Sequence, residues 1–200
     1  RSCFNHPLFI ETWVKRATEA LQPFSLDRRQ QALLLFTAHS IPTSMAATSA
    51  YEAQLQDVAQ MVSQRIGVPA WQLVYQSRSG PPQQPWLEPD ILDALEKIAA
   101  DDPSRPILLL PIGFVSDHME VLYDLDDEAA RKATELGLEM VRVPTPGTDP
   151  LFVQMIREMV QERMSDSPAR AALGSFPACP DICPTDCCKY DPPRRPVPGS

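Results

Sequence analysis

The fold is decided by the stretch Ala32-Leu33-Leu34-Leu35-Phe36-Thr37, an apolar run that ends on one threonine. A short continuous run of this kind is typical of a strand that is covered on both faces. His39 follows just past the carboxyl end of the run. The stretch therefore predicts a buried strand of a mainly parallel sheet, with a histidine at the edge of that sheet.

Strands and helices alternate along the chain on both sides of this run. Further strands are predicted at 71–75, 107–112 and 140–143, and helices at 51–66, 89–100, 127–136 and 150–164, together with an opening helix that Asn5 caps and that ends before Pro23. Strands interleaved with helices indicate βαβ units, whose right-handed crossovers cover both faces of a parallel sheet. We expect one three-layer α/β domain over residues 1–165.

Composition and charge limit the classes of function. With 200 residues, of which 44% are hydrophobic, the chain can bury the core of one domain. Its net charge of −8 would repel phosphate backbones, which argues against a nucleic-acid partner. No glycine-rich phosphate loop is present, so no nucleotide cofactor is expected. Because the sequence has neither a long apolar run nor a secretory signal, we expect a soluble, cytoplasmic protein.

The two ends of the chain differ from the domain between them. The chain begins without Met and enters a helix almost at once, so we expect an N-terminal portion of a longer protein to be absent. Residues 166–200 form a Pro-rich tail that cannot build a core alone. Four cysteines in this tail fall within ten residues: Cys179, Cys183, Cys187 and Cys188. Such crowding suits a metal or cluster site better than a distributed disulfide framework.

Polar loops follow the first three predicted strands, where ligands of open parallel sheets bind. His39 lies in the first loop and His118 in the third. Imidazole can take or give a proton at neutral pH and can bind iron, although a loop histidine can also simply bond to the backbone. His6, beside a helix start, is interpreted as structural.

The acidic residues of the third loop allow two interpretations. Asp117 followed by Glu120 resembles a capping box at a helix start. Alternatively, Glu120 and Asp124 share one helix face that Asp127 and Glu128 extend, and such carboxylates attract a divalent cation and accept protons. A similar choice applies to the aromatic side chains, which could line a flat apolar ligand or belong to the core: Trp86, Phe114 and Tyr123.

Three segments together resemble ferrochelatases, and particularly the bacterial coproporphyrin ferrochelatases. They are His39-Ser40-Ile41-Pro42; Tyr75-Gln76-Ser77-Arg78-Ser79-Gly80-Pro81-Pro82 with Pro85-Trp86-Leu87-Glu88-Pro89-Asp90; and Pro111-Ile112-Gly113-Phe114-Val115-Ser116-Asp117-His118-Met119-Glu120-Val121-Leu122-Tyr123-Asp124-Leu125-Asp126. Their order and spacing are similar to those of the family, and the resemblance runs from about Phe4 to Met164.

The resemblance implies a fold and a set of site residues. The fold is the Rossmann-like, class II chelatase-like one, in which two similar domains enclose a porphyrin cleft; this chain resembles the second domain and the end of the first. By resemblance, His39 and Glu120 are catalytic and bind the substrate iron. Supporting residues of an acidic relay would be Asp117, His118 and Asp124. Residues lining the porphyrin pocket would be Ser40, Pro42, Trp86 and Phe114.

The activity implied is that of a lyase of haem biosynthesis, which inserts Fe²⁺ into coproporphyrin III to give coproheme. Iron replaces two pyrrole protons only if the ring is distorted and a base accepts those protons. Alternatives are a protoporphyrin IX ferrochelatase, a chelatase for cobalt or nickel, and a non-catalytic porphyrin or iron–sulfur binding module. Expected partners are the porphyrin, the absent N-terminal domain and, peripherally, a membrane, and the fragment alone could be inactive.

Several bacterial ferrochelatases carry a 2Fe–2S cluster, which the resemblance extends to the cysteines of this chain. The favoured ligands are Cys3, Cys179 and either Cys187 or Cys188, because two neighbouring cysteines cannot easily both bind one iron. Cys183 is a further candidate. The alternatives are a zinc site and a tail without ligated cysteines.

Overall fold

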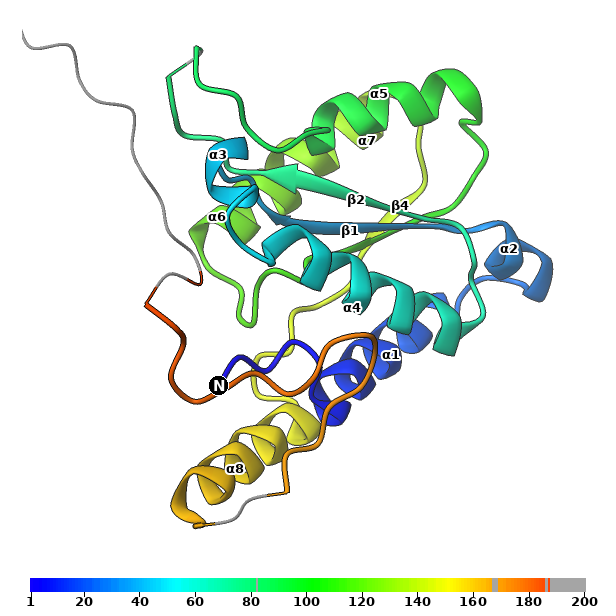
Figure 1. The fold of residues 1–200 in the computed structure, drawn as a ribbon. Coiled ribbons are helices and arrows are strands. Elements are labelled where there is room, and N and C mark those ends of the chain that lie inside the picture. The colour runs from blue at the N-terminus through cyan, green and yellow to red at the C-terminus, as the bar shows by residue number, and fades with distance from the viewer. Residues whose placement is uncertain (82, 167–168, 186, 188–200) are drawn as a thin grey trace, which may run out of the picture.

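The computed structural model describes residues 1–81, 83–166, 169–185 and 187, and its centre is a four-stranded parallel sheet (Figure 1). The strands lie in the order β2-β1-β3-β4. Their bounds are β1 Leu33–His39, β2 Trp71–Gln76, β3 Ile107–Leu110 and β4 Met140–Arg142. Each predicted strand is present, with its ends shifted by at most two residues, so the mainly parallel sheet is confirmed.

Helices cover both faces of the sheet, which confirms the predicted three-layer α/β fold (Figure 1). One face carries α1 Pro7–Leu21 and α4 Tyr51–Ile66. The other carries α5 Ile91–Asp101, the π-helix η1 Leu122–Ala129 and α7 Ala130–Glu135. The remaining helices are α2 Leu26–Gln31, α3 Thr43–Ala46, α6 Met119–Val121 and α8 Pro150–Met164. None of the described helices is long and apolar enough to cross a membrane.

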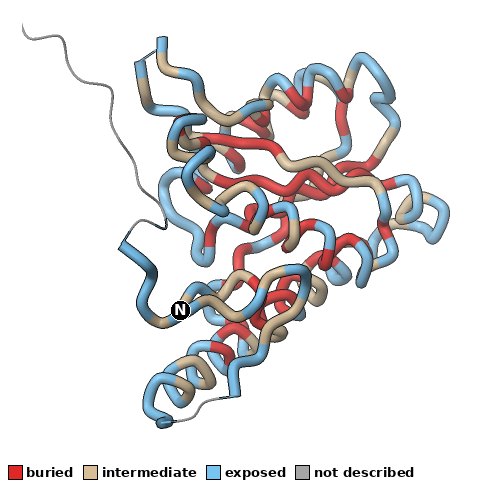
Figure 2. Tube along the Cα trace, in the orientation of Figure 1, coloured by how far each residue is buried: buried red, intermediate tan, exposed pale blue. Residues whose placement is uncertain are grey.

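Strand β1 supplies side chains to both halves of the core. Leu34 and Phe36 pack with α1 and α4, whereas Leu35 faces α5 and η1, and all three have no exposed surface. In Figure 2 almost the whole of β1 is red, whereas parts of the neighbouring strands are tan. The apolar run therefore forms the buried strand that its sequence predicted.

Two local predictions at helix starts were wrong. Asn5 does not cap α1; His6 does, because its Nδ1 accepts a hydrogen bond from the Leu8 amide at 3.2 Å. The Asn5 amide instead donates to the Phe176 and Pro177 carbonyls at 2.9 and 3.1 Å. The helix predicted at 127–136 begins upstream, because α6 and η1 continue directly into α7.

Residues 171–177 of the tail form a strap across the domain. The Leu173 amide donates to the Asn5 carbonyl at 2.9 Å. Asp57 of α4 accepts from the Ser175 amide at 3.1 Å and from its hydroxyl at 2.9 Å. The strap is irregular in structure, as expected for a Pro-rich tail, but several hydrogen bonds join it to Asn5, which precedes α1, and to Asp57 of α4.

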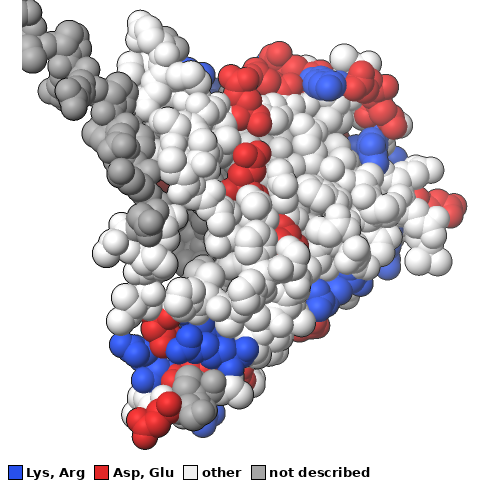
Figure 3. Space-filling view, in the orientation of Figure 1, with Lys and Arg blue, Asp and Glu red and all other residues white. Residues whose placement is uncertain are grey.

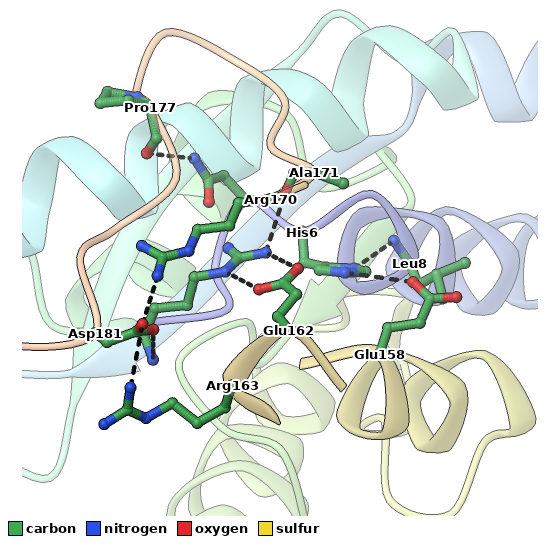
Figure 4. Close-up of polar contacts among 11 residues, drawn as sticks. His6, Leu8, Glu158, Glu162, Arg163, Arg170, Ala171, Pro177 and Asp181 are labelled. Carbon is green, nitrogen blue, oxygen red and sulfur yellow. Dashed lines mark hydrogen bonds and ion pairs between the residues drawn. The ribbon is translucent and has the colours of Figure 1, made fainter. Parts of the chain in front are cut away.

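Charged side chains hold the strap's flanks to α8. Arg1 pairs with Glu162 at 2.7 Å and donates to the Ala171 carbonyl at 3.0 Å, and Asp181 contacts both Arg163 and Arg170 (Figure 4). In Figure 3 a group of basic side chains, mixed with acidic ones, lies at this end of the molecule. These contacts place the segment that carries Cys179 beside the end of α8.

Replacing Gly174 by Ala should detach the strap, because Gly174 has φ +77° and an added Cβ would collide with the Asp57 carboxylate. Gly67→Ala is the matched control: Gly67 has φ +72°, but a Cβ there meets nothing within 4 Å. In limited proteolysis, the tail of Gly174→Ala should be cut about 10-fold faster than that of the wild type. The tail of Gly67→Ala should be cut at the wild-type rate. Equal tail cleavage in both variants would contradict the clamping role of Asp57.

Candidate functional site

His39 and Glu120 lie together above the carboxyl ends of the central strands. His39 is the last residue of β1, and Glu120 is in α6, at the start of the helical segment that follows β3. The His39 Nε2 and Glu120 Oε1 atoms are 3.9 Å apart, and the two side chains are one-third and one-half exposed. The edge of the sheet therefore carries an imidazole and a carboxylate that face each other and can be reached by a ligand.

The backbone determines which nitrogen of His39 carries the proton. Its Nδ1 lies 2.5 Å from the Ser40 carbonyl oxygen. Because a carbonyl only accepts, Nδ1 must be the donor, and in the neutral ring Nε2 then has a free lone pair. The nitrogen that faces Glu120 is therefore the one that can accept a proton or bind a metal ion.

The separation of 3.9 Å is too long for a direct hydrogen bond between His39 and Glu120. It does leave room for a small ion, since bonds from a divalent first-row metal such as zinc to imidazole nitrogen or carboxylate oxygen are about 2.0–2.2 Å long. The pair could hold such an ion in a bent arrangement or take up protons.

Residues at the end of β2 hold the helical segment that carries Glu120. Gln76 Nε2 donates to the Glu120 carbonyl at 3.2 Å and lies 3.4 Å from Asp124 Oδ2. The Ser77 hydroxyl also donates to Asp124. Asp124 lies in η1, and π-helical turns are rare and often found at functional sites.

A small acidic pocket adjoins these residues. It has a volume of about 190 Å³, and its lining includes Asp90, Asp124 and Glu128. Burial raises the pKa of Asp90, and the nearby charges of Asp93, Asp124 and Glu128 raise it further, against a hydrogen bond from the Leu92 amide that lowers it. The lining also includes Arg78, so it holds three carboxylates and one guanidinium, and the excess of acidic groups favours a cation.

The structure does not bring Asp117 to Glu120. Asp117 Oδ1 accepts from Arg142 Nη1 and from the Thr145 hydroxyl, both at 3.0 Å, and α6 has no side-chain cap. The predicted capping box was therefore wrong, because residues distant in sequence bind the carboxylate. His118 is the N-cap residue of α6, and its ring stacks at an angle on Phe114 with centroids 5.1 Å apart.

The residues expected to line a porphyrin pocket lie at varied depths. Ser40 is buried, and its hydroxyl donates to the Leu87 carbonyl at 2.9 Å. Pro42 forms an isolated bridge with Trp86. Phe114 is 6% exposed and belongs to the core beneath η1. Contact of these residues with a porphyrin stays a prediction.

Comparison with known proteins settles the family. The sequence pattern of ferrochelatases matches residues 1–164. The chain belongs to the ferrochelatase family. It is 48% identical to a ferrochelatase of Rhodopirellula baltica and 45% identical to a coproporphyrin III ferrochelatase of Streptomyces coelicolor, in both cases over the whole chain. The family resemblance predicted from the three segments is thus confirmed.

The chain spans a little over half the length of these relatives, 56% and 58% respectively. Among solved structures, a multi-domain protein of Deinococcus radiodurans described as structurally similar to chelatases superposes with a TM-score of 0.51 at 14% identity, over 78% of this chain and 30% of that one. This likeness concerns the fold alone, and it agrees with the predicted chelatase-like architecture.

Three cysteines of the tail lie close together in the part of the chain that the structure describes. Cys179, Cys183 and Cys187 line one pocket of about 720 Å³, next to the loop that follows His39. Cys3 is half-buried, and burial raises the pKa of its thiol. Among the described residues, no three His, Cys, Asp or Glu side chains are placed to hold a metal ion. Cys188 lies outside the described residues.

The sequence interpretation assigned no role to several polar residues that shape the site. Gln76 was read only as part of the second segment, although its position one residue past a predicted strand was a usable signal. Tyr51 donates its hydroxyl to the His39 carbonyl at 2.9 Å, and burial raises its pKa to about 12. This contact joins the start of a helix to the end of a strand, and no local sequence pattern at either residue predicts it.

Replacing Asp90 by Asn should stabilise the protein at pH 7. The raised pKa of Asp90 means that its ionised form opposes folding, so stability is lost as pH rises through that pKa. Asn keeps the cap on the Leu92 amide and cannot ionise. Thermal unfolding should show a higher Tm for Asp90→Asn at pH 7, with the difference shrinking towards pH 4.

Asp93→Asn is the control, because Asp93 is exposed in the first turn of the same helix and favours the helix dipole. It should leave the Tm unchanged or lower it slightly. A lower Tm for Asp90→Asn at pH 7 would show that its carboxylate is stabilising.

Proposed function

We propose that the protein to which this chain belongs inserts ferrous iron into coproporphyrin III, as a step of haem biosynthesis. The observation that carries the proposal is the His39–Glu120 pair, with an imidazole lone pair 3.9 Å from a carboxylate at the open edge of the sheet. The name of the Streptomyces coelicolor relative supports coproporphyrin III as the porphyrin.

The reaction requires a base for two pyrrole protons, since the porphyrin gives up two protons as Fe²⁺ enters. His39 Nε2 can accept one of them because Nδ1 already holds its own proton against Ser40. The Glu120 carboxylate, one-half exposed, can accept the other. A flat ring placed with its centre over this pair would expose its nitrogens to both groups.

Iron needs a route with oxygen ligands that bind it without trapping it. Asp124 and Glu128 lie in the π-helix that follows Glu120. With Asp90 they line the acidic pocket beside the His39–Glu120 pair. Carboxylates arranged in this way attract Fe²⁺ and can pass it or the released protons along the helix. His118, exposed at the start of α6, stays a further candidate for this relay, whereas Asp117 is engaged by Arg142.

The other wall of the cleft is assigned to the part of the ferrochelatase chain that the longer relatives carry in addition. Helix α8 exposes a stripe of apolar side chains, of which Val160 is 53% and Met164 82% exposed. A groove of about 540 Å³ runs along this helix, and Arg1 lies in its lining. The exposed stripe therefore offers an apolar surface to this additional part of the protein.

In the full-length protein, His39→Ala should reduce the rate of iron insertion into coproporphyrin III at least about 100-fold, because the positioned proton acceptor is lost. Glu120→Gln, which keeps the shape of the side chain, should also lower kcat. Porphyrin binding, followed by the change in the Soret absorption under anaerobic conditions, should persist in both variants. His118→Ala serves as a comparison and should affect the rate less than His39→Ala.

Normal insertion rates in His39→Ala would refute the catalytic assignment. Porphyrin binding without metal insertion in the wild-type protein would support a non-catalytic binding module instead. Equal turnover of coproporphyrin III and protoporphyrin IX would remove the proposed substrate preference. Faster insertion of cobalt or nickel than of iron would reassign the metal.

We also propose that the tail cysteines and Cys3 hold a 2Fe–2S cluster. The support is that Cys179, Cys183 and Cys187 line one pocket, to which Ser2, the neighbour of Cys3 in sequence, also contributes. The protein purified without oxygen should contain two iron and two sulfide ions per chain and absorb in the visible range, and Cys3→Ser should lose both signals. One zinc ion and no sulfide would favour the zinc alternative.

A further inference from the structure

Gln76 connects the two sides of the proposed catalytic pair. Its backbone carbonyl accepts a hydrogen bond from the Ser40 amide at 2.8 Å, directly after His39. Its side-chain amide donates to the Glu120 carbonyl at 3.2 Å. One residue at the end of β2 is thus bound both to the loop that follows His39 and to the helix that carries Glu120.

The sheet register makes this position specific. His39 and Gln76 are opposite each other, at the ends of two parallel strands that end together. At the end of β2, the side chain of Gln76 is therefore long enough for its amide to reach the first turn of α6. Because α6 has only three residues and no side-chain cap, the contact from Gln76 is a significant restraint on where Glu120 lies.

The orientation of the Gln76 amide follows from its partners. Both atoms that it meets, the Glu120 carbonyl oxygen and Asp124 Oδ2, accept hydrogen bonds, so the nitrogen must face them. The residue is only 1% exposed, and its amide oxygen is buried with no hydrogen-bond partner among the described residues. Leaving a buried amide oxygen unsatisfied costs stability, so packing alone does not favour glutamine here.

We infer that Gln76 is a positioning residue for Glu120, which sets the separation between that carboxylate and His39 Nε2. The inference rests on the proposed function, because it assigns to Gln76 an effect on the insertion step. Its amide donates to the Glu120 carbonyl, and none of the hydrogen bonds among the described residues joins it to the His39 ring. Its influence on the reaction therefore passes through the placement of Glu120.

The test is Gln76→Met in the full-length protein, assayed anaerobically with coproporphyrin III and ferrous iron. Methionine keeps the length of the side chain and removes both the donor and the unsatisfied oxygen. The kcat should fall about 10–100-fold, the range typical for the loss of an outer-shell hydrogen bond, while the KM for porphyrin and the Tm change little. Gln72→Met in the same strand is the matched control and should keep the wild-type kcat, because Gln72 lies opposite Leu35, away from the strand ends that carry His39 and Gln76.

A double-mutant comparison separates positioning from structural support. If Gln76 acts through Glu120, adding Gln76→Met to Glu120→Gln should cause no further loss of rate. Gln76→Glu, which would place a second carboxylate against Asp124, should reduce kcat more than Gln76→Met does. A wild-type kcat in Gln76→Met, full additivity with Glu120→Gln, or a fall in Tm that accounts for the lost rate would each overturn the inference.

These outcomes can be told apart from a failure of the proposed function. If His39→Ala and Glu120→Gln keep the wild-type rate, the chelatase assignment itself fails. If both lose activity while Gln76→Met does not, the chelatase assignment stands and the positioning role is wrong.

Discussion

The pairing of β1 on both of its edges is the constraint on which the rest of the structure depends. β1 pairs in parallel with β2 on one side and β3 on the other, and its central side chains have no exposed surface. A slip of one residue would exchange the faces to which Leu34 and Leu35 point and would expose or overcrowd both halves of the core. The burial of this strand therefore also fixes the point at which His39 emerges.

From that point the site follows in two steps. The backbone after β1 orients the imidazole, because the Ser40 carbonyl accepts a hydrogen bond from Nδ1–H and leaves Nε2 to face the opposite helix. The neighbouring strand then places that helix, through side chains at its own end that reach α6 and η1. The two groups of the proposed catalytic pair are thus positioned by adjacent strands of one sheet and by the first turns of one helical segment.

The sequence was sufficient for the layers of the fold and for the strands, because apolar runs and helical spacing record burial locally. Local patterns failed where a distant residue competes for a polar group. Asp117 fits a capping box, but Arg142 and Thr145 bind its carboxylate, and Asn5 fits a helix cap, but the strap takes its amide. Such contacts join residues that are distant in sequence. They depend on the tertiary structure, so a local sequence pattern does not predict them.

The residues of the candidate site also fall into those that the sequence identified and those that it did not. His39 and Glu120 were identified by resemblance, and their loops could be placed because both follow strands. Gln76 could not be assigned a role, since its importance comes from the register that sets it opposite His39. Similarly, Asp90 was predicted only as part of a segment, and its effect depends on the proximity of Asp124 and Glu128 across the acidic pocket.

The central claim is that the neutral His39 ring presents an unprotonated Nε2 to Glu120. Nitrogen-15 NMR of the full-length protein labelled at histidine, recorded at pH 8 where an unperturbed imidazole is neutral, measures the tautomer directly, with His39→Gln identifying the resonance. The account predicts a proton on Nδ1 and a free Nε2. A His39 ring protonated at Nε2 in its neutral form would contradict it.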